Sequence, residues 1–313
     1  MSENAIALTE IRMEFPGVVA LDRVSFCVSS GSIHGFLGPN GSGKTTSINI
    51  ISGLLTPTAG EVILAPAGQG AKGIGLLPET PPLYPTMTVE QYLQFVANLY
   101  LTRKESTKAV EQTIDECGLR DCRKRIIAPL SKGYKQRVGI AQALIYSPAI
   151  VILDEPTVGL DPHSIDQIRA LILSLKDRCT VILSSHNLNE VERLCDQVTI
   201  LNQGSVVASG EMQEIKQNFK TTHQVVAQVK QWNQELSEEL NQTLPNCQVL
   251  EYQQSAGRYQ VTVSFDGSEQ ELSQLSLQLA NRGQALFKIQ EEEMSLEQIF
   301  KQATTQSGSR GGN

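Results

Sequence analysis

The chain has 313 residues, of which 40% are hydrophobic and 19% are charged, so its composition is that of an ordinary globular protein and not of a disordered one. No apolar run reaches the roughly 18 residues that a membrane-spanning helix needs, and the first residues lack the features of a secretory signal, so we expect a soluble, cytoplasmic protein. A net charge of -7 opposes direct binding to nucleic acid, and the six scattered cysteines show no zinc-binding or disulfide pattern.

The first motif in the chain lies in a predicted strand, loop and helix between residues 33 and 55. Residues 33 to 37 predict a short buried strand, and Ile48, Ile51 and Leu55 recur at the spacing of one helical face. This order of elements is the context that a phosphate-binding loop requires.

The loop between the strand and the helix fits the pattern G-x-x-x-x-G-K-[ST], written here as Gly38-Pro39-Asn40-Gly41-Ser42-Gly43-Lys44-Thr45. Its glycines permit positive φ angles that turn backbone N–H groups toward phosphate oxygens, and the helix N-terminus adds partial positive charge. Lys44 adds a full positive charge, and the Thr45 hydroxyl is suited to bind Mg2+. The loop therefore predicts that the chain binds a nucleoside triphosphate with Mg2+.

Residues 80 to 138 predict a helical insertion, because no strand-like run interrupts them before Ala149. The segment from Thr88 to Gln91 fits a capping box that opens a helix, and Gly118 is placed to end the next one. Ser131 is placed near the N-cap of a third helix.

Two acids end the next predicted strand, which covers residues 150 to 155. Asp154 can hold Mg2+ from the side opposite Thr45, and Glu155 can polarise a water molecule for attack on the γ-phosphate. Farther along, Asp161 and Pro162 fit the N-cap and first position of a helix.

A second, smaller α+β domain is predicted over residues 219 to 303, where the composition shifts toward Gln, Ser and Glu. Its predicted order is strand, helix, strand, strand, helix, strand, helix, which resembles a ferredoxin-like fold. The predicted strands cover residues 225–229, 249–253, 259–265 and 285–289, and the predicted helices cover 231–244 and 269–280. Residues 304 to 313 are expected to form a disordered tail. This domain is interpreted either as a ligand sensor or as a packing or dimer-stabilising appendage.

Residues 1 to about 218 resemble the nucleotide-binding domain of ATP-binding cassette (ABC) transporters in the order and spacing of their motifs. The resemblance implies an α/β P-loop NTPase fold with a helical insertion. The corresponding segments are Gly38 to Thr45 (Walker A), Leu130 to Tyr134 (signature), Ile150 to Glu155 (Walker B), Gly159 to Asp161 (D-loop) and His186 (switch histidine).

The same resemblance implies a role for each matching residue. Phe15 would stack on adenine, and Thr46 would extend the phosphate-binding loop. Hydrolysis would use Lys44, Glu155 and His186. The residues that would complete the site of a second subunit are Ser131, Gly133 and Asp161.

Two positions depart from the usual family pattern. The signature keeps Ser131 and Gly133 but has Lys132 and Tyr134 in the other slots. In the Q-loop, Glu79 stands where many relatives have Gln, so it is either a metal-contacting acid beside Thr45 and Asp154 or a surface acid. Both departures are similar to the ABC-2 exporter branch, including gliding-motility-type ATPase subunits.

The resemblance also implies partners. We expect a homodimer with two composite ATP sites, peripheral on the cytoplasmic face of the cell membrane. A separate permease would dock on the helical insertion of this chain, beside Glu79. The alternative is a soluble ABC ATPase acting on nucleic acid or the ribosome. The paired cassettes, coiled coils and basic arms that are usual in that class are not visible in the sequence.

Overall fold

The computed structural model describes residues 4–65, 73–176, 178–219, 223–244, 246–255, 257–265, 269–292 and 295–307. They form two compact units, one from Met1–Met212 with Phe300–Asn313 and one from Gln213–Ile299. The N-terminal stretch of the first unit ends at Met212, whose backbone N–H donates to the carbonyl of Asp196. The boundary that we expected near residue 218 therefore lies inside helix α7 (Met212–Phe219).

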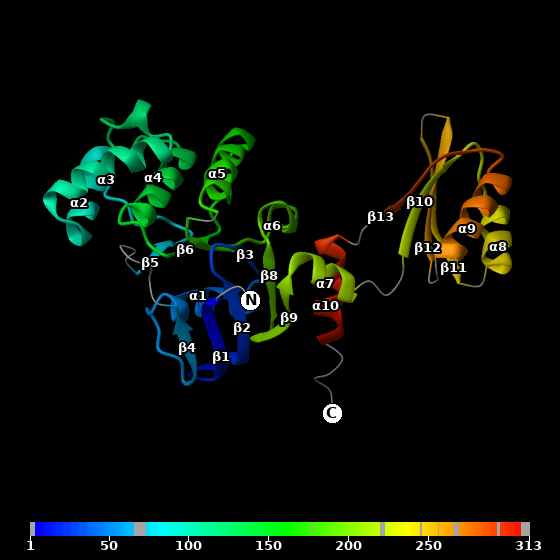
Figure 1. Cartoon of the computed structure of the whole chain (residues 1–313), viewed down its shortest axis with the longest axis horizontal. Helices are drawn as coiled ribbons and strands as arrows, with labels where there is room; N and C mark the ends of the chain where they lie inside the picture. Colours follow the sequence, from blue (N-terminus) through cyan, green and yellow to red (C-terminus); the bar gives the residue numbers. More distant parts are fainter. Residues whose placement is uncertain are drawn as a thin grey trace. The chain divides into compact units, whose positions relative to one another are not determined.

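Six strands form the central sheet of the first unit, in the order β5-β6-β7-β3-β8-β9 (Figure 1). Neighbours from β5 through β8 run parallel, and β9 pairs with β8 in the antiparallel direction. The loops that follow β3, β5, β6 and β7 therefore leave the sheet at one edge, which is where ligands bind in open α/β sheets. The strand bounds are β3 (Ile33–Leu37), β5 (Ile74–Leu77), β6 (Ile150–Asp154), β7 (Thr180–Ser184), β8 (Gln197–Asn202) and β9 (Ser205–Glu211).

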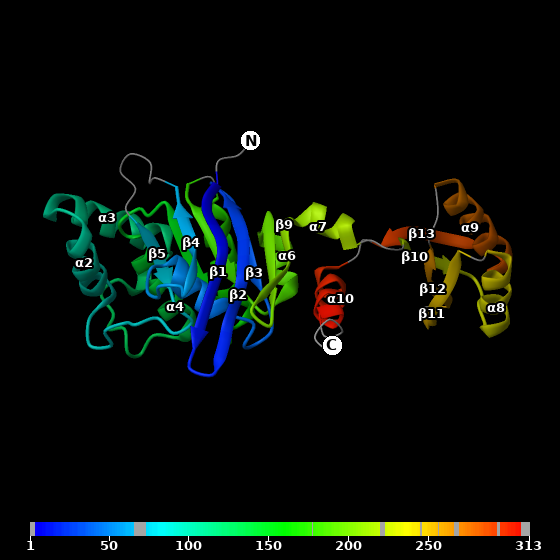
Figure 2. The same cartoon turned by 90° about the horizontal axis from the view of Figure 1, so that it is seen from below.

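A second sheet in the same unit has three antiparallel strands, β1 (Asn4–Phe15), β2 (Val18–Ser29) and β4 (Ala59–Leu64), in the order β2-β1-β4 (Figure 2). Its residues Ile6 and Phe26 join Phe36 and Ile152 of the central sheet in one buried core. The expected α/β fold therefore contains two separate sheets in this unit. Local apolar patterns do not separate the two, because pairing depends on distant segments.

Helix α1 (Lys44–Ile51) follows the loop after β3, and Ile48 and Ile51 are buried as the pattern predicts. The helix is shorter than expected, because Ser52 is its C-cap and Gly53 has a φ of +75°. Leu55, the third member of the expected helical face, lies beyond the helix but packs against the same core.

Helices α2, α3 and α4 follow β5 and pack against one another (Figure 1). Thr88 forms the predicted capping box with Gln91, Gly118 follows the C-cap of α3, and the Ser131 side chain caps α4. Their bounds are α2 (Val89–Tyr100), α3 (Arg103–Glu116) and α4 (Lys132–Leu144), with a 3-10 turn at Arg120–Cys122 between α3 and α4. The helical region thus runs past residue 138 to Leu144.

Helices α5 (Pro162–Ser174) and α6 (Leu188–Leu194) follow β6 and β7, respectively. Asp161 caps α5 as predicted, and its carboxylate accepts the backbone N–H of Ser164 at 3.0 Å. Asn187 caps α6 in the same way.

The second unit contains the four-stranded antiparallel sheet β11-β12-β10-β13, which is the strand order of the predicted ferredoxin-like fold. Leu240 of α8 and Leu275 of α9 are buried in its core, and both helices lie on one face of the sheet (Figure 1). The bounds are β10 (His223–Val229), α8 (Gln234–Thr243), β11 (Cys247–Ser255), β12 (Arg258–Phe265), α9 (Glu269–Arg282) and β13 (Leu286–Glu292).

Two expectations for this part of the chain were wrong at their edges. Helix α8 begins at Gln234 and not at residue 231, because the Asn233 side chain caps it. The expected disordered tail overlaps helix α10 (Leu296–Ser307), so residues 304–307 are helical. Residues 308–313 lie outside the described residues.

Candidate nucleotide-binding site

The loop between β3 and α1 is tightly packed, with little space beside Gly38 and Gly43. A Cβ atom at Gly38 would lie 2.2 Å from Oγ of Ser42 and 2.6 Å from the carbonyl oxygen of Leu201, so no larger residue fits. Gly43, the N-cap of α1, has a φ of +103°, which side chains disfavour. These two constraints explain two of the glycines in the phosphate-binding pattern by geometry.

Lys44 folds back over this loop. Its ammonium donates to the carbonyl oxygens of Gly38 at 2.6 Å and Pro39 at 3.3 Å. Burial lowers the pKa of Lys44, and the negative charges of Glu155 and Asp154 oppose that shift. The charge of Lys44 therefore interacts with both acids at the end of β6, Asp154 and Glu155.

Asp154 and Thr45 provide oxygen atoms of the kind that Mg2+ prefers. The Ser184 hydroxyl at the end of β7 donates to Oδ1 of Asp154, which fixes the carboxylate, and Thr45 is exposed in the first turn of α1. In the described part of the chain, no group of three or more His, Cys, Asp or Glu side chains forms a metal cage. This donor set fits Mg2+ with most of its remaining ligands from phosphate and water, as in other nucleotide sites.

Glu155, directly after β6, and His186, in the loop after β7, are in contact. Oε2 of Glu155 lies 2.8 Å from Nδ1 of His186, and the side chains are 15% and 64% exposed, respectively. The Glu155 backbone has a φ of +50° and its N–H donates to the carbonyl of Ser184, so the chain turns sharply out of β6. Burial raises the pKa of Glu155, and the hydrogen bond from His186 opposes this. Such a carboxyl is suited to act as a general base.

The signature segment caps α4 and packs on α5. The Ser131 hydroxyl accepts the backbone N–H of Tyr134 at 3.4 Å, and a Cβ at Gly133 would lie only 2.4 Å from Oγ of Ser164. Within the described residues, no hydrogen bond or ion pair joins Ser131, Gly133 or Asp161 to the phosphate-binding loop of the same chain. Within one chain, the described bonds of Ser131 and Asp161 are thus local to the starts of α4 and α5.

Tyr134, one of the two departures from the usual signature pattern, has a local structural role. The Tyr134 hydroxyl donates to Asp121 of the 3-10 turn, and the Arg137 guanidinium lies 4.3 Å from the centre of the Tyr134 ring. Arg137 also donates to the carbonyl of Gly118 at 2.7 Å. Tyr134 therefore fastens the start of α4 to the rest of the helical region.

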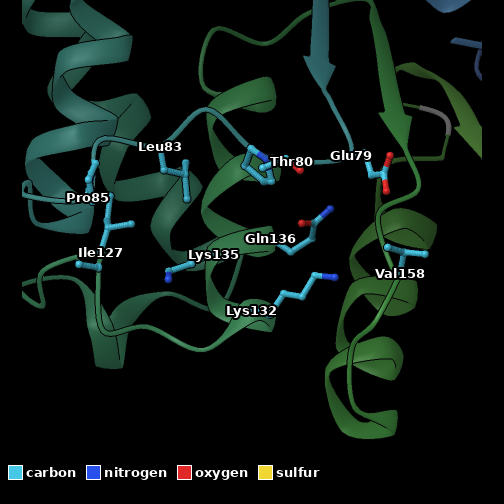
Figure 3. A pocket seen from close by; sticks show the side chains of 11 residues that line it. Glu79, Thr80, Leu83, Pro85, Ile127, Lys132, Lys135, Gln136 and Val158 are labelled. Carbon is cyan, nitrogen blue, oxygen red and sulfur yellow. The ribbon is translucent and has the colours of Figure 1, made fainter.

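Phe15 and Glu79 are the two remaining candidate site residues, at the end of β1 and after β5. Phe15 ends β1 and is 41% exposed, so its ring is accessible for stacking. Glu79 follows β5 and lines a cavity of about 320 Å³ together with Leu83, Lys132 and Gln136 (Figure 3). Figure 3 shows Glu79 and Val158 on one side of this cavity and the side chains of α4 below it.

Four buried or half-buried polar residues around the site were missed from the sequence. They are Thr157, Ser184, Ser185 and Glu190, whose hydrogen bonds connect the loops after β6 and β7. Ser184 and Ser185 directly precede His186, and this adjacency was the available signal. Glu190 gave no signal, because its partner Thr157 is 33 positions away in the sequence.

Comparisons with known proteins place these motifs in a family. Residues 21–158 match the family model described as ABC transporter. The chain is 37% identical over 204 residues to the uncharacterized ABC transporter ATP-binding protein YxlF of Bacillus subtilis (strain 168), covering 64% of this chain and 69% of that one. It is 32% identical over 313 residues to YdbJ, another such protein of the same strain, covering 97% of each chain. The chain belongs to the family of ABC transporter ATP-binding proteins.

A further relative in this family is the bacitracin transport ATP-binding protein BcrA of Bacillus licheniformis, 36% identical over 210 residues, with 64% of this chain and 68% of that one covered. Among solved structures, cbiO1 from Clostridium perfringens, part of the ABC transporter complex cbiONQ, is 27% identical with a TM-score of 0.62, covering 78% of this chain and 96% of that one. The ABC ATPase therefore has the predicted fold class.

A dimeric post-hydrolysis structure of the ATP-binding cassette MJ0796 with ADP and Pi is 25% identical to this ABC ATPase, with a TM-score of 0.58, and 66% of this chain and 98% of that one are covered. ATP binding and hydrolysis are the activity of the family. None of the helices in the described residues is both long and apolar enough to span a membrane.

Proposed function

We propose that this chain is the ATP-hydrolysing subunit of an exporter whose membrane-spanning permease is a separate protein. One observation carries the proposal: the phosphate-binding loop, Asp154, Glu155 and His186 lie at the same edge of the central sheet, at the ends of the neighbouring parallel strands β3, β6 and β7. Relatives such as the bacitracin transport ATP-binding protein BcrA favour transport over the soluble alternative that acts on nucleic acid.

The phosphates of ATP bind where the loop and Lys44 concentrate positive charge. Lys44 exchanges its bonds to the Gly38 and Pro39 carbonyls for phosphate oxygens. Oγ of Ser42 is buried and has no hydrogen-bond partner among the described residues, so it is placed to serve the same ligand. The exposed ring of Phe15 stacks on adenine.

Thr45 and Asp154 hold Mg2+, and Glu79 is its third proposed contact. When bound, Mg2+ offsets the negative charge that develops on the transferred phosphoryl group. Glu155 takes the proton of the attacking water, since its raised pKa favours proton uptake and its carboxylate interacts with the charge of Lys44. His186 orients Glu155 through their hydrogen bond.

Ser131, Gly133 and Asp161 complete the site of a second copy of the chain. In one chain, no hydrogen bond or ion pair among the described residues joins them to the loop of Lys44, which supports this assignment, because residues that bind the same nucleotide would then come from two subunits. The chain retains Lys44, Glu155, His186 and Ser131, so a homodimer has two competent composite sites.

The permease docks at the cavity beside Glu79, where the apolar side chains of Leu83 and Ile127 and the lysines Lys132 and Lys135 are available to it. Docking on a membrane protein places the ATPase on the cytoplasmic face of the cell membrane. Purification of the tagged full-length chain with an ABC-2-type permease supports this part of the proposal. Recovery of nucleic acid or ribosomes instead of a permease contradicts it.

Subunit mixing tests the composite site. Lys44→Ala removes the loop charge, and Ser131→Asp places a negative charge where the partner's γ-phosphate binds while Asp remains a good N-cap. Each variant alone is expected to be inactive. A mixture forms heterodimers in which the intact Lys44 of one chain faces the intact Ser131 of the other, so hydrolysis returns.

Mixing Lys44→Ala with Glu155→Gln is the matched control. Lys44 and Glu155 serve the nucleotide of their own chain, so both sites of that heterodimer are damaged and hydrolysis stays absent. Recovery in this control, or no recovery in the first mixture, contradicts the composite arrangement.

A further inference from the structure

Glu190 of α6 is a buried acid that the proposed chemistry does not use. Its side chain is fully buried, and Oε2 accepts the hydroxyl of Thr157 at 2.7 Å and the hydroxyl of Ser185 at 3.2 Å. Both donors are themselves buried. The carboxylate therefore joins two hydroxyls in a setting where hydrogen bonds to charged groups are strong.

The two hydroxyls belong to the two loops that carry the proposed hydrolytic pair. Thr157 lies two residues after Glu155, in the connection that leads to Asp161 and α5, and Ser185 directly precedes His186. The strands before these loops are parallel neighbours, with Asp154 opposite Ser184. One carboxylate oxygen thus links both loops just beyond the point where they leave the sheet.

The other oxygen of Glu190 faces α5. Oε1 lies 3.6 Å from Nε of Arg169, and neither atom has a hydrogen-bond partner among the described residues. Burial of a carboxylate with one direct charge partner is costly, and an apolar residue would pack here at lower cost. The arrangement does, however, order the two loops.

We propose that Glu190 is a positioning residue for ATP hydrolysis, which holds the loops of Glu155 and His186 in register through Thr157 and Ser185. The inference rests on the proposed roles of Glu155 and His186. Because the phosphate-binding loop lies after β3 and makes none of these bonds, Glu190 acts on the rate of hydrolysis and not on nucleotide affinity.

Thr157→Val tests the link with a variant of the same shape that removes one hydrogen bond to Glu190. We expect kcat to fall by about 10- to 100-fold, as small misplacements of catalytic groups do, while the Kd for ATP changes by less than about twofold. Thr157→Ser restores the hydroxyl and is expected to recover most of kcat. Thr113→Val, at a buried threonine of α3, is the matched control and should leave kcat unchanged.

Combining variants separates a shared role from independent damage. Glu190→Gln and Thr157→Val act on the same hydrogen bond, so the double variant should lose little more than the worse single variant. If the fold-decrease in kcat of the double variant equals the product of the two single decreases, the proposal is overturned. A wild-type kcat in folded Thr157→Val also overturns the proposal. The proposal is overturned as well if Thr113→Val and Thr157→Val have the same decrease in melting temperature and the same loss of kcat.

Glu155→Gln distinguishes failure of this inference from failure of the proposed function. If Glu155→Gln is inactive while Thr157→Val keeps the wild-type kcat, the role of Glu190 is wrong and the role of Glu155 stands. If Glu155→Gln hydrolyses ATP at the wild-type rate, the proposed function itself fails.

Discussion

Nδ1 of His186 lies 2.8 Å from Oε2 of Glu155, although the two residues follow different strands and are 31 positions apart. The pairing is possible because β6 and β7 are parallel neighbours and end at the same edge of the sheet. It gives the half-buried acid a hydrogen bond that favours its ionised form, against the effect of burial.

This pairing predicts a pH dependence. Glu155 must be ionised to accept a proton, and burial raises its pKa above the ordinary value of 4.5, so activity should rise with pH through a pKa higher than 4.5. His186→Ala removes the bond that lowers this pKa, so the acidic limb of its normalised kcat profile should move to higher pH. His163→Ala, which removes an exposed histidine on α5, is the control and should keep the wild-type profile. A shift of the His186→Ala limb to lower pH contradicts the assignment.

Gly38→Ala should damage the phosphate-binding loop by overpacking. The added Cβ would meet the Leu201 carbonyl of β8, which cannot move aside as a flexible side chain can. Overpacking of this kind costs about 1–3 kcal/mol, so the melting temperature should fall and the affinity for ATP should weaken. The measurements are a thermal melt and a titration with ATP.

Gly53→Ala is the matched control for that substitution. Gly53 has a positive φ and no atom lies within 4 Å of its added Cβ, so the cost is backbone strain of about 1–2 kcal/mol without overpacking. Its affinity for ATP should equal that of the wild type. Equal affinity in Gly38→Ala would show that the tight closure of the loop is unimportant for binding.

Tryptophan fluorescence reports unfolding of the second unit alone, because Trp232 is the chain's single tryptophan and is buried in that unit's core. Leu240→Ala should lower the unfolding free energy seen by tryptophan fluorescence by about 2–5 kcal/mol, since Leu240 is fully buried there. ATP should stabilise the unit that contains Lys44, measured by circular dichroism, and should leave the fluorescence transition in place. An equal shift of both transitions by ATP would show that the two units unfold together.

Local chemistry explains which features could be predicted from the sequence. The caps at Thr88, Ser131 and Asp161 depend on residues within one turn, and each forms as expected. The early end of α1 also has a local cause, the positive φ of Gly53. The apolar spacing of Leu55 indicated a longer helix, so the end was not predicted.

Long-range pairing explains most of what the sequence did not reveal. The separate three-stranded sheet depends on β1 pairing with β4, about fifty residues along the chain, which alternation of apolar residues does not encode. Glu190 could not be identified for the same reason, because its hydroxyl donor Thr157 reaches it only after β6 and β7 pair.

The most direct test of the account is the mass of Glu155→Gln in solution with ATP. We expect this variant to bind ATP without hydrolysing it and to accumulate as a dimer of twice the 34.2 kDa chain mass in sedimentation analysis. Lys44→Ala should stay at the monomer mass under the same conditions. A Glu155→Gln chain that remains monomeric with bound ATP, or that hydrolyses ATP at the wild-type rate, would contradict the central claim.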